Sequence, residues 1–342
     1  MYDLANLSFA YGKPQSTGLI KTSADDFKVD EVLGFELTGE GEHLFLLIEK
    51  IGINTEELVK ALARTLGKSE KAISYAGLKD RQAQTTQWLC VHSPGEELEG
   101  LDNLEGNGWR VIKYSRHLKK LKTGALAANE FELVLRELTE KSEIENRLLK
   151  IQSKGVPNYF GTQRFGHEGQ NIPKAEAMLL GGIKIKNRFL RGLYYSTARS
   201  LLFNKILSER VQSGNWDQAL AGDIMQLAGK NSIFPIEIPD PLINERMNNF
   251  DLSPAAPLWG KGEERASLEA LVIQDKALNP YEKWCQALEQ HGLERAYRPL
   301  RLQVEGLNWN WPDEQTLILK FRLEAGSYAT SVLRELIREG NN

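Results

Sequence analysis

The sequence predicts an α+β protein in which a β-rich domain, formed from both chain ends, carries an inserted, mainly helical α/β domain. Three observations support this. Apolar residues alternate with period two in the first part of the chain, a helical pattern takes over near residue 155, and a β pattern returns after Arg298-Pro299. A chain of 342 residues also exceeds one comfortable core. We therefore expect one domain over residues 1–154 and 304–342 and an inserted domain over residues 155–303.

Alternating apolar residues predict the strands of the first domain. Leu44, Leu46 and Ile48 share one face of a strand over residues 43–49. Phe131, Leu133 and Leu135 do the same over residues 129–136. Further strands are expected at 19–21, 27–32, 88–91, 110–114, 300–304 and 316–323, and helices at 54–66, 142–153 and 329–338.

The inserted domain is expected to consist mainly of helices. Residues 191–212 form the longest helical candidate in the chain. Proline-rich stretches around 235–241 and 254–257 are expected to interrupt the helical pattern.

The composition is that of an ordinary folded globular protein, with 41% apolar and 26% charged residues. Cys90 and Cys285 lie far apart and the five histidines form no HxH or HExxH motif, so no metal site is expected. No apolar run reaches membrane-spanning length and the N-terminus has no secretion signal, which predicts a soluble, cytoplasmic protein. Leu62 stands where a P-loop ending at Gly67-Lys68-Ser69 needs glycine, so no nucleotide cofactor is expected.

Positive charge is segregated along the chain. The net charge is −3, yet residues 106–129 contain six Lys or Arg and no acid, and residues 177–208 contain another six without an acid. Two acid-free basic stretches in an acidic protein favour a polyanionic partner.

One carboxylate stands out in the segment from Ala76 to Gln87. An apolar run and Gly77 lead to Lys79-Asp80-Arg81, and a β-rich segment follows. The pattern presents Asp80 on a short turn between two cations, and turns held by rigid strands are where chemistry concentrates.

Five segments in this order resemble the TruD family of tRNA pseudouridine synthases, and their spacing fits over nearly the whole chain. They are Lys21 with residues 26–29, residues 77–87, Asn129-Glu130-Phe131, residues 157–166 and residues 326–330. The resemblance implies a catalytic domain with a mixed or antiparallel sheet and the family's own inserted domain. It implies isomerisation of uridine to pseudouridine in tRNA, at uridine 13, without a metal or cofactor. We expect tRNA as the partner and a monomeric protein.

The resemblance also implies roles for individual residues. Asp80 matches the catalytic aspartate, and with an ordinary pKa near 3.9 its carboxylate is ionised at neutral pH. It can attack the ribose anomeric carbon or remove the 2′ proton, and the sequence does not choose between these routes. Lys21 matches the basic partner of that aspartate. Phe131 matches the active-site aromatic residue, although its parity with Leu133 and Leu135 also fits a core position.

Further residues are expected to bind the substrate. An extruded uridine needs an aromatic face, which Phe27 and Tyr328 can supply. The Asn129 amide can read the uracil edge. Asn158 and Arg164 lie in a segment suited to RNA contact, and the remaining candidates are Ser327, beside Tyr328, for substrate and Lys79 and Arg81 for phosphates.

Two other functions stay open at this point. A non-catalytic RNA-binding protein or RNA chaperone would share the basic stretches but would not need Asp80. An Asp-dependent nucleoside or glycoside hydrolase would need a second carboxylate. Candidates for that second carboxylate are Asp26, Asp30 and Glu31.

Overall fold

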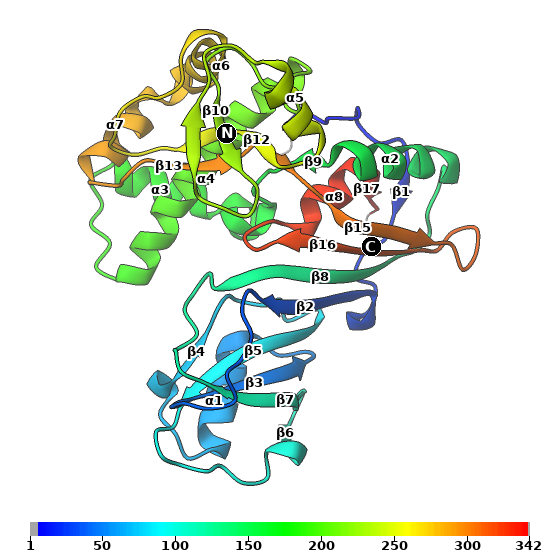
Figure 1. Ribbon diagram of the computed structural model, residues 1–342, viewed down its shortest axis with the longest axis vertical. Coiled ribbons are helices and arrows are strands. Elements are labelled where there is room, and N and C mark those ends of the chain that lie inside the picture. Colours follow the sequence, from blue (N-terminus) through cyan, green and yellow to red (C-terminus); the bar gives the residue numbers. More distant parts are fainter. Residues whose placement is uncertain (1–5, 341–342) are drawn as a thin grey trace. The chain divides into compact units, whose positions relative to one another are not determined.

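The computed structural model describes residues 6–340, which form two compact units (Figure 1). The helical unit contains the described residues up to Pro14 together with Glu145–Val304 and Ser327–Leu336. The sheet unit contains Gln15–Ile144, Glu305–Gly326 and the described residues from Ile337 onward. The sequence analysis assigned the segment that ends at Pro14 and the segment Ser327–Leu336 to the β-rich domain, whereas here they belong to the helical unit. They pack with the helices because Leu7 and Tyr328 contribute to the apolar core of that unit.

The sheet unit is built on one nine-stranded sheet with strand order β15-β16-β8-β2-β5-β3-β7-β6, in which β4 pairs with β5. Only the β2–β5 pairing is parallel, so the sheet is mixed, as predicted. Both ends of the chain supply strands, which confirms the α+β prediction. The strands are β2 (Phe27–Leu33), β3 (His43–Lys50), β4 (Ile73–Tyr75), β5 (Gln84–His92), β6 (Glu105–Gly106), β7 (Trp109–His117), β8 (Leu126–Leu135), β15 (Glu305–Asn310) and β16 (Leu317–Glu324).

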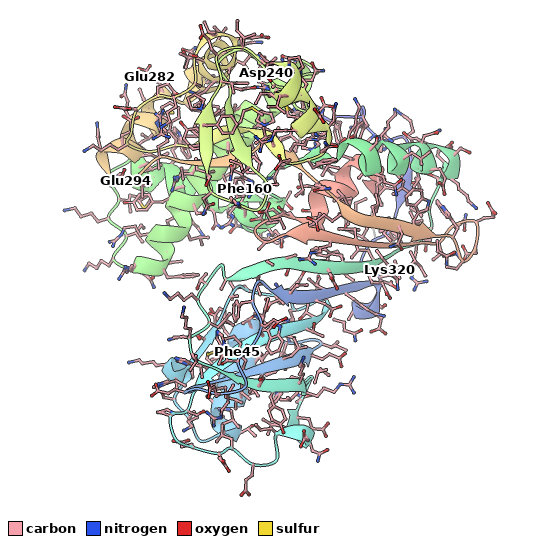
Figure 2. The ribbon with its side chains drawn as sticks, in the orientation of Figure 1. Phe45, Phe160, Asp240, Glu282, Glu294 and Lys320 are labelled. Carbon is pink, nitrogen blue, oxygen red and sulfur yellow. The ribbon has the colours of Figure 1, made fainter. Side chains whose placement is uncertain are left out.

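Period-two alternation fixes the register where the two chain ends meet in the sheet. Phe131 lies opposite Phe321, and Leu133 lies opposite Leu319, so apolar side chains fall on one face of β8 and β16. The other face is polar, and the Lys320 ammonium (Figure 2) lies 2.7 Å from a Glu132 carboxylate oxygen. A one-residue slip would exchange these faces, so the pattern specifies a single pairing.

Helix α1 (Thr55–Thr65) covers one face of the sheet beside β3 and β5. Leu58 and Leu62 pack with Leu46 and Leu89 in a buried cluster. Asn54 starts the helix by accepting a hydrogen bond from the Glu57 N–H at 2.8 Å, while the Glu57 carboxylate accepts one from the Asn54 N–H.

Three predicted elements of the first domain are placed or bounded differently. The strand expected at 19–21 is wrong, because β1 is Thr17–Gly18 and Lys21 has a φ of 55°, which a strand cannot contain. The strand expected at 300–304 is reduced to β14 (Arg301–Leu302), which pairs with β9 (Val156–Pro157). The final helix, α8 (Ala329–Leu336), ends early because Arg338 enters β17 (Arg338–Glu339), the partner of β1.

The helical unit contains a four-stranded antiparallel sheet of order β11-β10-β12-β13, whose individual strands were not located from the sequence. Pro254 and Pro257, expected to interrupt a helical pattern, lie inside β12. Proline lacks the N–H but keeps its carbonyl, and the Pro254 carbonyl accepts a hydrogen bond from the Leu300 N–H at 2.8 Å. The strands are β10 (Ile224–Leu227), β11 (Ile233–Pro235), β12 (Leu252–Leu258) and β13 (Ala296–Pro299).

The α-helices of this part of the chain agree with the predicted helical texture. They are α2 (Lys141–Lys154), which crosses the unit boundary, α3 (Asn171–Leu179), α4 (Arg188–Gln212), α5 (Pro241–Asn248), α6 (Leu268–Leu278) and α7 (Glu282–Gln290). Short 3-10 helices occur at Ala24–Asp26, Glu70–Ala72, Leu101–Asn103, Thr162–Phe165, His167–Gly169 and Asn279–Tyr281. Within residues 6–340, no helix is both long enough and apolar enough to cross a bilayer.

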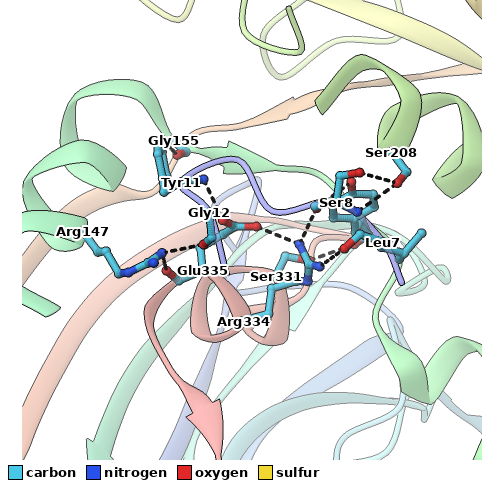
Figure 3. A network of polar contacts seen from close by, with 11 residues as sticks. Leu7, Ser8, Tyr11, Gly12, Arg147, Gly155, Ser208, Ser331, Arg334 and Glu335 are labelled. Carbon is cyan, nitrogen blue, oxygen red and sulfur yellow. Dashed lines mark hydrogen bonds and ion pairs between the residues drawn. The ribbon is translucent and has the colours of Figure 1, made fainter. Parts of the chain in front are cut away.

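A buried polar network ties the N-terminal segment to α8 within the helical unit (Figure 3). The Glu335 carboxylate accepts hydrogen bonds from Arg334 at 2.7 Å and from the Tyr11 N–H at 3.3 Å. Arg334 also donates to the Leu7 carbonyl at 2.8 Å. Burial raises the pKa of Glu335, while the positive charge of Arg334 opposes that rise. The network explains why the first described residues belong to this unit.

Candidate active site

Asp80 lies in a loop (residues 77–81) that is anchored at several points. The Gln87 amide donates to the Gly77 carbonyl at 2.6 Å, and the Lys79 N–H donates to the Thr55 hydroxyl at 2.9 Å. The Gly52 N–H donates to the Arg81 carbonyl at 3.2 Å. These bonds fix the backbone on both sides of Asp80, which is the rigidity that a catalytic side chain needs.

The Asp80 carboxylate forms an ion pair with Lys21. The Lys21 ammonium lies 2.5 Å from Asp80 Oδ2, and the Gln82 N–H donates to Asp80 Oδ1 at 3.0 Å. Lys21 also lies 4.3 Å from the centre of the Phe27 ring, a cation–π distance. The left-handed backbone of Lys21 turns the chain after β1 so that the side chain can reach this position.

The surroundings keep Asp80 ionised. Partial burial by itself raises the pKa of the Asp80 carboxyl, but hydrogen bonds from Lys21 and the Gln82 N–H, with the charges of Lys21 and Lys50, outweigh it. The net result is a pKa below the ordinary value. The side chain of Asp80 remains 38% exposed, so a substrate can approach the charged group.

Lys50 is a component of the site that the sequence reading missed. Its side chain is completely buried and donates hydrogen bonds to the Asp80 carbonyl at 2.8 Å and to the Ile53 carbonyl at 2.9 Å. Burial lowers the pKa of Lys50 to about 8. The sequence feature that could have revealed Lys50 is its position in the alternation, because it lies on the same inward face of β3 as Leu46 and Ile48.

Asn129 is held by a buried charge pair. The Lys79 ammonium donates to the Asn129 amide oxygen at 2.9 Å and lies 2.8 Å from Glu31 Oε1, an ion-pair contact. The other Glu31 oxygen accepts the Trp88 N–H at 2.8 Å. Burial raises the pKa of Glu31, while the charge of Lys79 opposes it. With its oxygen held by Lys79, Asn129 has its NH₂ group left to donate. Lys79, which was expected to contact phosphate, is engaged by Asn129 and Glu31.

Phe131 and Phe27 lie on the same face of the sheet as Asn129. The Phe27 and Phe131 rings meet edge to face with centres 6.4 Å apart, and Phe131 stacks on Phe321 at 5.2 Å. Phe131 is 9% exposed. Lys21, Phe27, Asp80, Asn129 and Phe131 therefore all belong to the sheet unit. Contacts link Asp80, Lys21, Phe27 and Phe131 in a row, and Asn129 joins them through Lys79, the neighbour of Asp80 in the chain.

The remaining candidates belong to the helical unit. The Asn158 amide donates to the Pro299 carbonyl at 2.9 Å and its oxygen accepts from Arg298 at 2.5 Å, so this buried side chain is engaged inside the fold. Arg164 donates to the Tyr328 hydroxyl at 3.0 Å and to the Ser196 hydroxyl at 3.1 Å.

Two aromatic rings of the helical unit, Phe203 and Tyr328, pack against Phe160, which is labelled in Figure 2. Phe160 packs against Tyr328 with ring centres 6.0 Å apart, and the Arg164 guanidinium lies 5.5 Å from the Phe160 ring. Ser327, beside Tyr328, is partly buried. Arg164, Ser327 and Tyr328 thus lie at one place in this unit, whereas Asn158 faces Arg298.

Comparison with known proteins gives the same family as the sequence segments. The family profile of tRNA pseudouridine synthase D (TruD) matches residues 4–183 and 170–336. The chain belongs to the TruD family. Among TruD proteins, that of Legionella pneumophila (strain Lens) is 46% identical over 99% of this chain and 100% of its own length. The TruD protein of Proteus mirabilis (strain HI4320) is 41% identical over 100% of this chain and 98% of its own.

A solved structure from Methanosarcina mazei, described as "Putative tRNA pseudouridine synthase D (TruD)", has the same fold. It superposes with a TM-score of 0.72 at 22% identity, covering 96% of this chain and 95% of its own. The TruD fold of this chain is therefore established by its architecture as well as by its sequence.

Proposed function

We propose that this protein isomerises uridine 13 of tRNA to pseudouridine, with Asp80 as the catalytic carboxylate. The observation that carries the proposal is the Asp80–Lys21 ion pair on an anchored loop of a TruD-family chain. Asp80 combines the two properties that the reaction needs, an ionised state and partial exposure.

The isomerisation breaks the bond between ribose C1′ and uracil N1 and forms a bond from C1′ to C5. The C5 hydrogen leaves as a proton and N1 gains one, so no electrons are gained or lost. In one route an Asp80 oxygen bonds to C1′ as uracil departs, and C5 later displaces it. In the other, Asp80 removes the 2′ proton to give a glycal and returns it when C1′ bonds to C5.

Neighbouring residues support either route. Lys21 stabilises the carboxylate before reaction and hydrogen-bonds to it, which orients the oxygens. Asn129, with its oxygen held by Lys79, can donate its NH₂ hydrogens to a uracil carbonyl oxygen. Phe27 and Phe131 supply the aromatic face against which an extruded uracil would stack.

The test is the exchange Asp80→Asn, assayed by tritium release from tRNA labelled at C5 of uridine. We expect tritium release to be lost while tRNA binding is retained, because the amide keeps the shape but not the charge. Asp30→Asn is the matched control, since Asp30 accepts the Thr86 hydroxyl at 2.5 Å on the polar face of the sheet. Undiminished tritium release by Asp80→Asn would remove Asp80 from the mechanism. If the wild-type protein binds tRNA but releases no tritium, a role in RNA binding alone is favoured.

A hydrolase is not favoured, because each candidate for the second carboxylate has a structural partner. Asp26 lies 2.7 Å from the Arg136 guanidinium, Asp30 accepts the Thr86 hydroxyl, and Glu31 is buried against Lys79. Mass analysis of the product separates the two reactions, since isomerisation conserves mass and hydrolysis frees uracil.

The proposal extends to the partner and the setting of the enzyme. The substrate is tRNA, bound by a monomer in the cytoplasm, and neither a metal ion nor a nucleotide cofactor takes part. Sequencing of pseudouridine positions in total tRNA treated with the purified protein tests the choice of uridine 13. Sedimentation of the protein with and without tRNA tests the monomer.

A further inference from the structure

A cluster of cations without acidic partners lies between α3 and the first turn of α4. Lys184, Lys186, Arg188 and Arg191 are all exposed. Across residues 6–340, none of the four forms an ion pair with another side chain. This contrasts with other cations of the protein, such as Arg210, which lies 2.8 Å from Asp223, and Arg295, which lies 2.7 Å from Glu264.

The same segment exposes large apolar side chains. Phe189 is 66% exposed, Ile183 is 55% exposed and Leu190 is 37% exposed. Single exposed apolar residues are common, but an exposed aromatic ring flanked by unpaired cations is the combination with which proteins bind single-stranded nucleic acid. We call residues 183–191 the α3–α4 surface.

The α3–α4 surface is held in place by its own hydrogen bonds. The Ile183 N–H donates to the Ala177 carbonyl at 3.2 Å, and Arg191 donates to the Ile185 carbonyl at 3.4 Å. Asn187 caps α4 by accepting the Leu190 N–H at 3.1 Å. Arg188 and Arg191 are three residues apart on α4 and therefore lie on neighbouring positions of one helix face. The cations are thus presented from an ordered backbone.

The other basic stretch differs in its two arginines, which make contacts within the fold. Arg110 lies 2.8 Å from Glu49, and Arg116 donates to the Gly41 carbonyl at 3.0 Å and the Ser93 carbonyl at 3.3 Å. Among residues 6–340 the four cations of the α3–α4 surface form no ion pair, and Arg191 donates to the Ile185 carbonyl. The contacts thus distinguish Arg110 from these cations, while Lys113, Lys119, Lys120 and Lys122 of the other stretch are exposed as well.

We propose that the α3–α4 surface binds an unpaired segment of the substrate RNA, with Lys184, Lys186 and Arg188 on phosphates and Phe189 stacked on a base. This inference rests on the proposed function, which supplies the RNA. Charge complementarity selects the partner, since the segment from Ala177 to Ser208 contains no acid. A stacked base would cover the apolar ring while the phosphates on either side meet the cations.

The first test measures affinity for unmodified tRNA against salt concentration. The variant Lys184→Gln/Lys186→Gln/Arg188→Gln should lower the slope of log affinity against log salt by about two, since each phosphate contact on a single strand contributes about 0.7. The control Lys230→Gln/Lys261→Gln/Lys283→Gln removes three exposed lysines of the same unit and should leave the slope unchanged. An unchanged slope in the first variant overturns the phosphate contacts.

The second test separates stacking from general apolar contact. Phe189→Ala should weaken tRNA binding by about 5- to 150-fold, Phe189→Leu should be as weak, and Phe189→Tyr should bind like wild type. Ile238→Ala, at a position that is 71% exposed, is the matched control and should have no effect. Wild-type affinity in Phe189→Leu would contradict stacking. Wild-type affinity in all Phe189 variants would show that this side chain does not contact the tRNA.

Activity assays on the same variants separate this inference from the proposed function. The α3–α4 variants should raise KM for tRNA and keep kcat at saturation, because they lose uniform binding. If wild type releases no tritium from C5-labelled tRNA, the proposed function fails. If wild type is active and the variants keep its KM and salt slope, this inference fails alone. Unchanged melting temperatures show that the variants are folded.

Discussion

The side-chain nitrogen of Lys50 donates a hydrogen bond to the backbone carbonyl of Asp80 at 2.8 Å, although Lys50 has no exposed surface. A second bond at 2.9 Å reaches the Ile53 carbonyl. The end of β3 therefore holds two neighbouring loops together through one ammonium group. The loop that carries the proposed catalytic carboxylate is positioned from beneath by a residue that a substrate cannot touch.

Replacing Lys50 by Met should lower kcat more than it changes KM for tRNA. The variant keeps the length of the side chain but frees the Asp80 carbonyl, so the carboxylate loses its fixed position. A displacement of about 1 Å can cost about 100-fold in rate, and a ten- to hundredfold loss is expected. Steady-state kinetics of tritium release give both constants. Lys320→Met, on the polar face of the sheet, is the control, and equal kcat in all three proteins would contradict the positioning role.

Lys50 should also contribute to the pH dependence of the free energy of unfolding. Its pKa is about 8 in the folded protein against an ordinary value of 10.5, so between these pH values the unfolded chain binds more protons. The free energy of unfolding therefore rises with pH across that window, by roughly 3 kcal/mol for this group. Urea unfolding from pH 7 to 10 should show the rise in wild type and a smaller one in Lys50→Met. Parallel curves would mean that Lys50 does not carry the effect.

Lys21→Met should move the acidic limb of the kcat profile to higher pH. Lys21 favours the charged form of Asp80, and without it the opposing effect of burial raises the pKa of the carboxyl. Rates of tritium release measured across the acid range give the limb. Lys28→Met is the matched control, because Lys28 pairs with Glu132 at 3.0 Å on the polar face. If the acidic limb of the kcat profile stays at its wild-type pH in Lys21→Met, Lys21 does not control the ionisation of Asp80.

Phe131 can be tested for a role beyond packing by comparison with Phe321. The two rings stack at 5.2 Å and are both buried, so Phe131→Leu and Phe321→Leu should destabilise the protein by similar amounts, about 1–3 kcal/mol. If uracil stacks on Phe131, only Phe131→Leu should also lose kcat, about tenfold or more. Urea unfolding and kinetics on both variants decide this, and equal kinetic losses would assign Phe131 to the core.

The fold could be predicted wherever local pattern and final environment agree. The alternation in β3, β8 and β16 survives because each strand buries one face, and the Asn54 cap acts within one turn of its helix. The β10–β13 sheet was not located because β10, β11 and β13 have only three or four residues and β12 contains two prolines. The β12–β13 pairing also joins strands distant in sequence, which a local pattern does not contain.

The candidate site, like the fold, could be predicted only in part. The sequence singled out Asp80 with Lys21, and the Asp80–Lys21 contact at 2.5 Å joins residues 59 apart in the chain. It treated Lys79 as a phosphate ligand, whereas the fold pairs Lys79 with Glu31 and Asn129. Which partners an ammonium finds depends on which strands become neighbours, and the local sequence does not contain that information.

The sequence by itself determined the TruD-type α+β chain and singled out Asp80 as a candidate on a turn, because motif order, alternation and residue chemistry are local properties. Tertiary structure alone decided which cations serve the fold and which remain free. Lys50 is buried beneath Asp80 and Lys79 is paired with Glu31, while the cations of the α3–α4 surface stay unpaired among the described residues. The physical reason is that burial and ion pairing depend on distances between residues far apart in the chain, and only the folded backbone sets those distances.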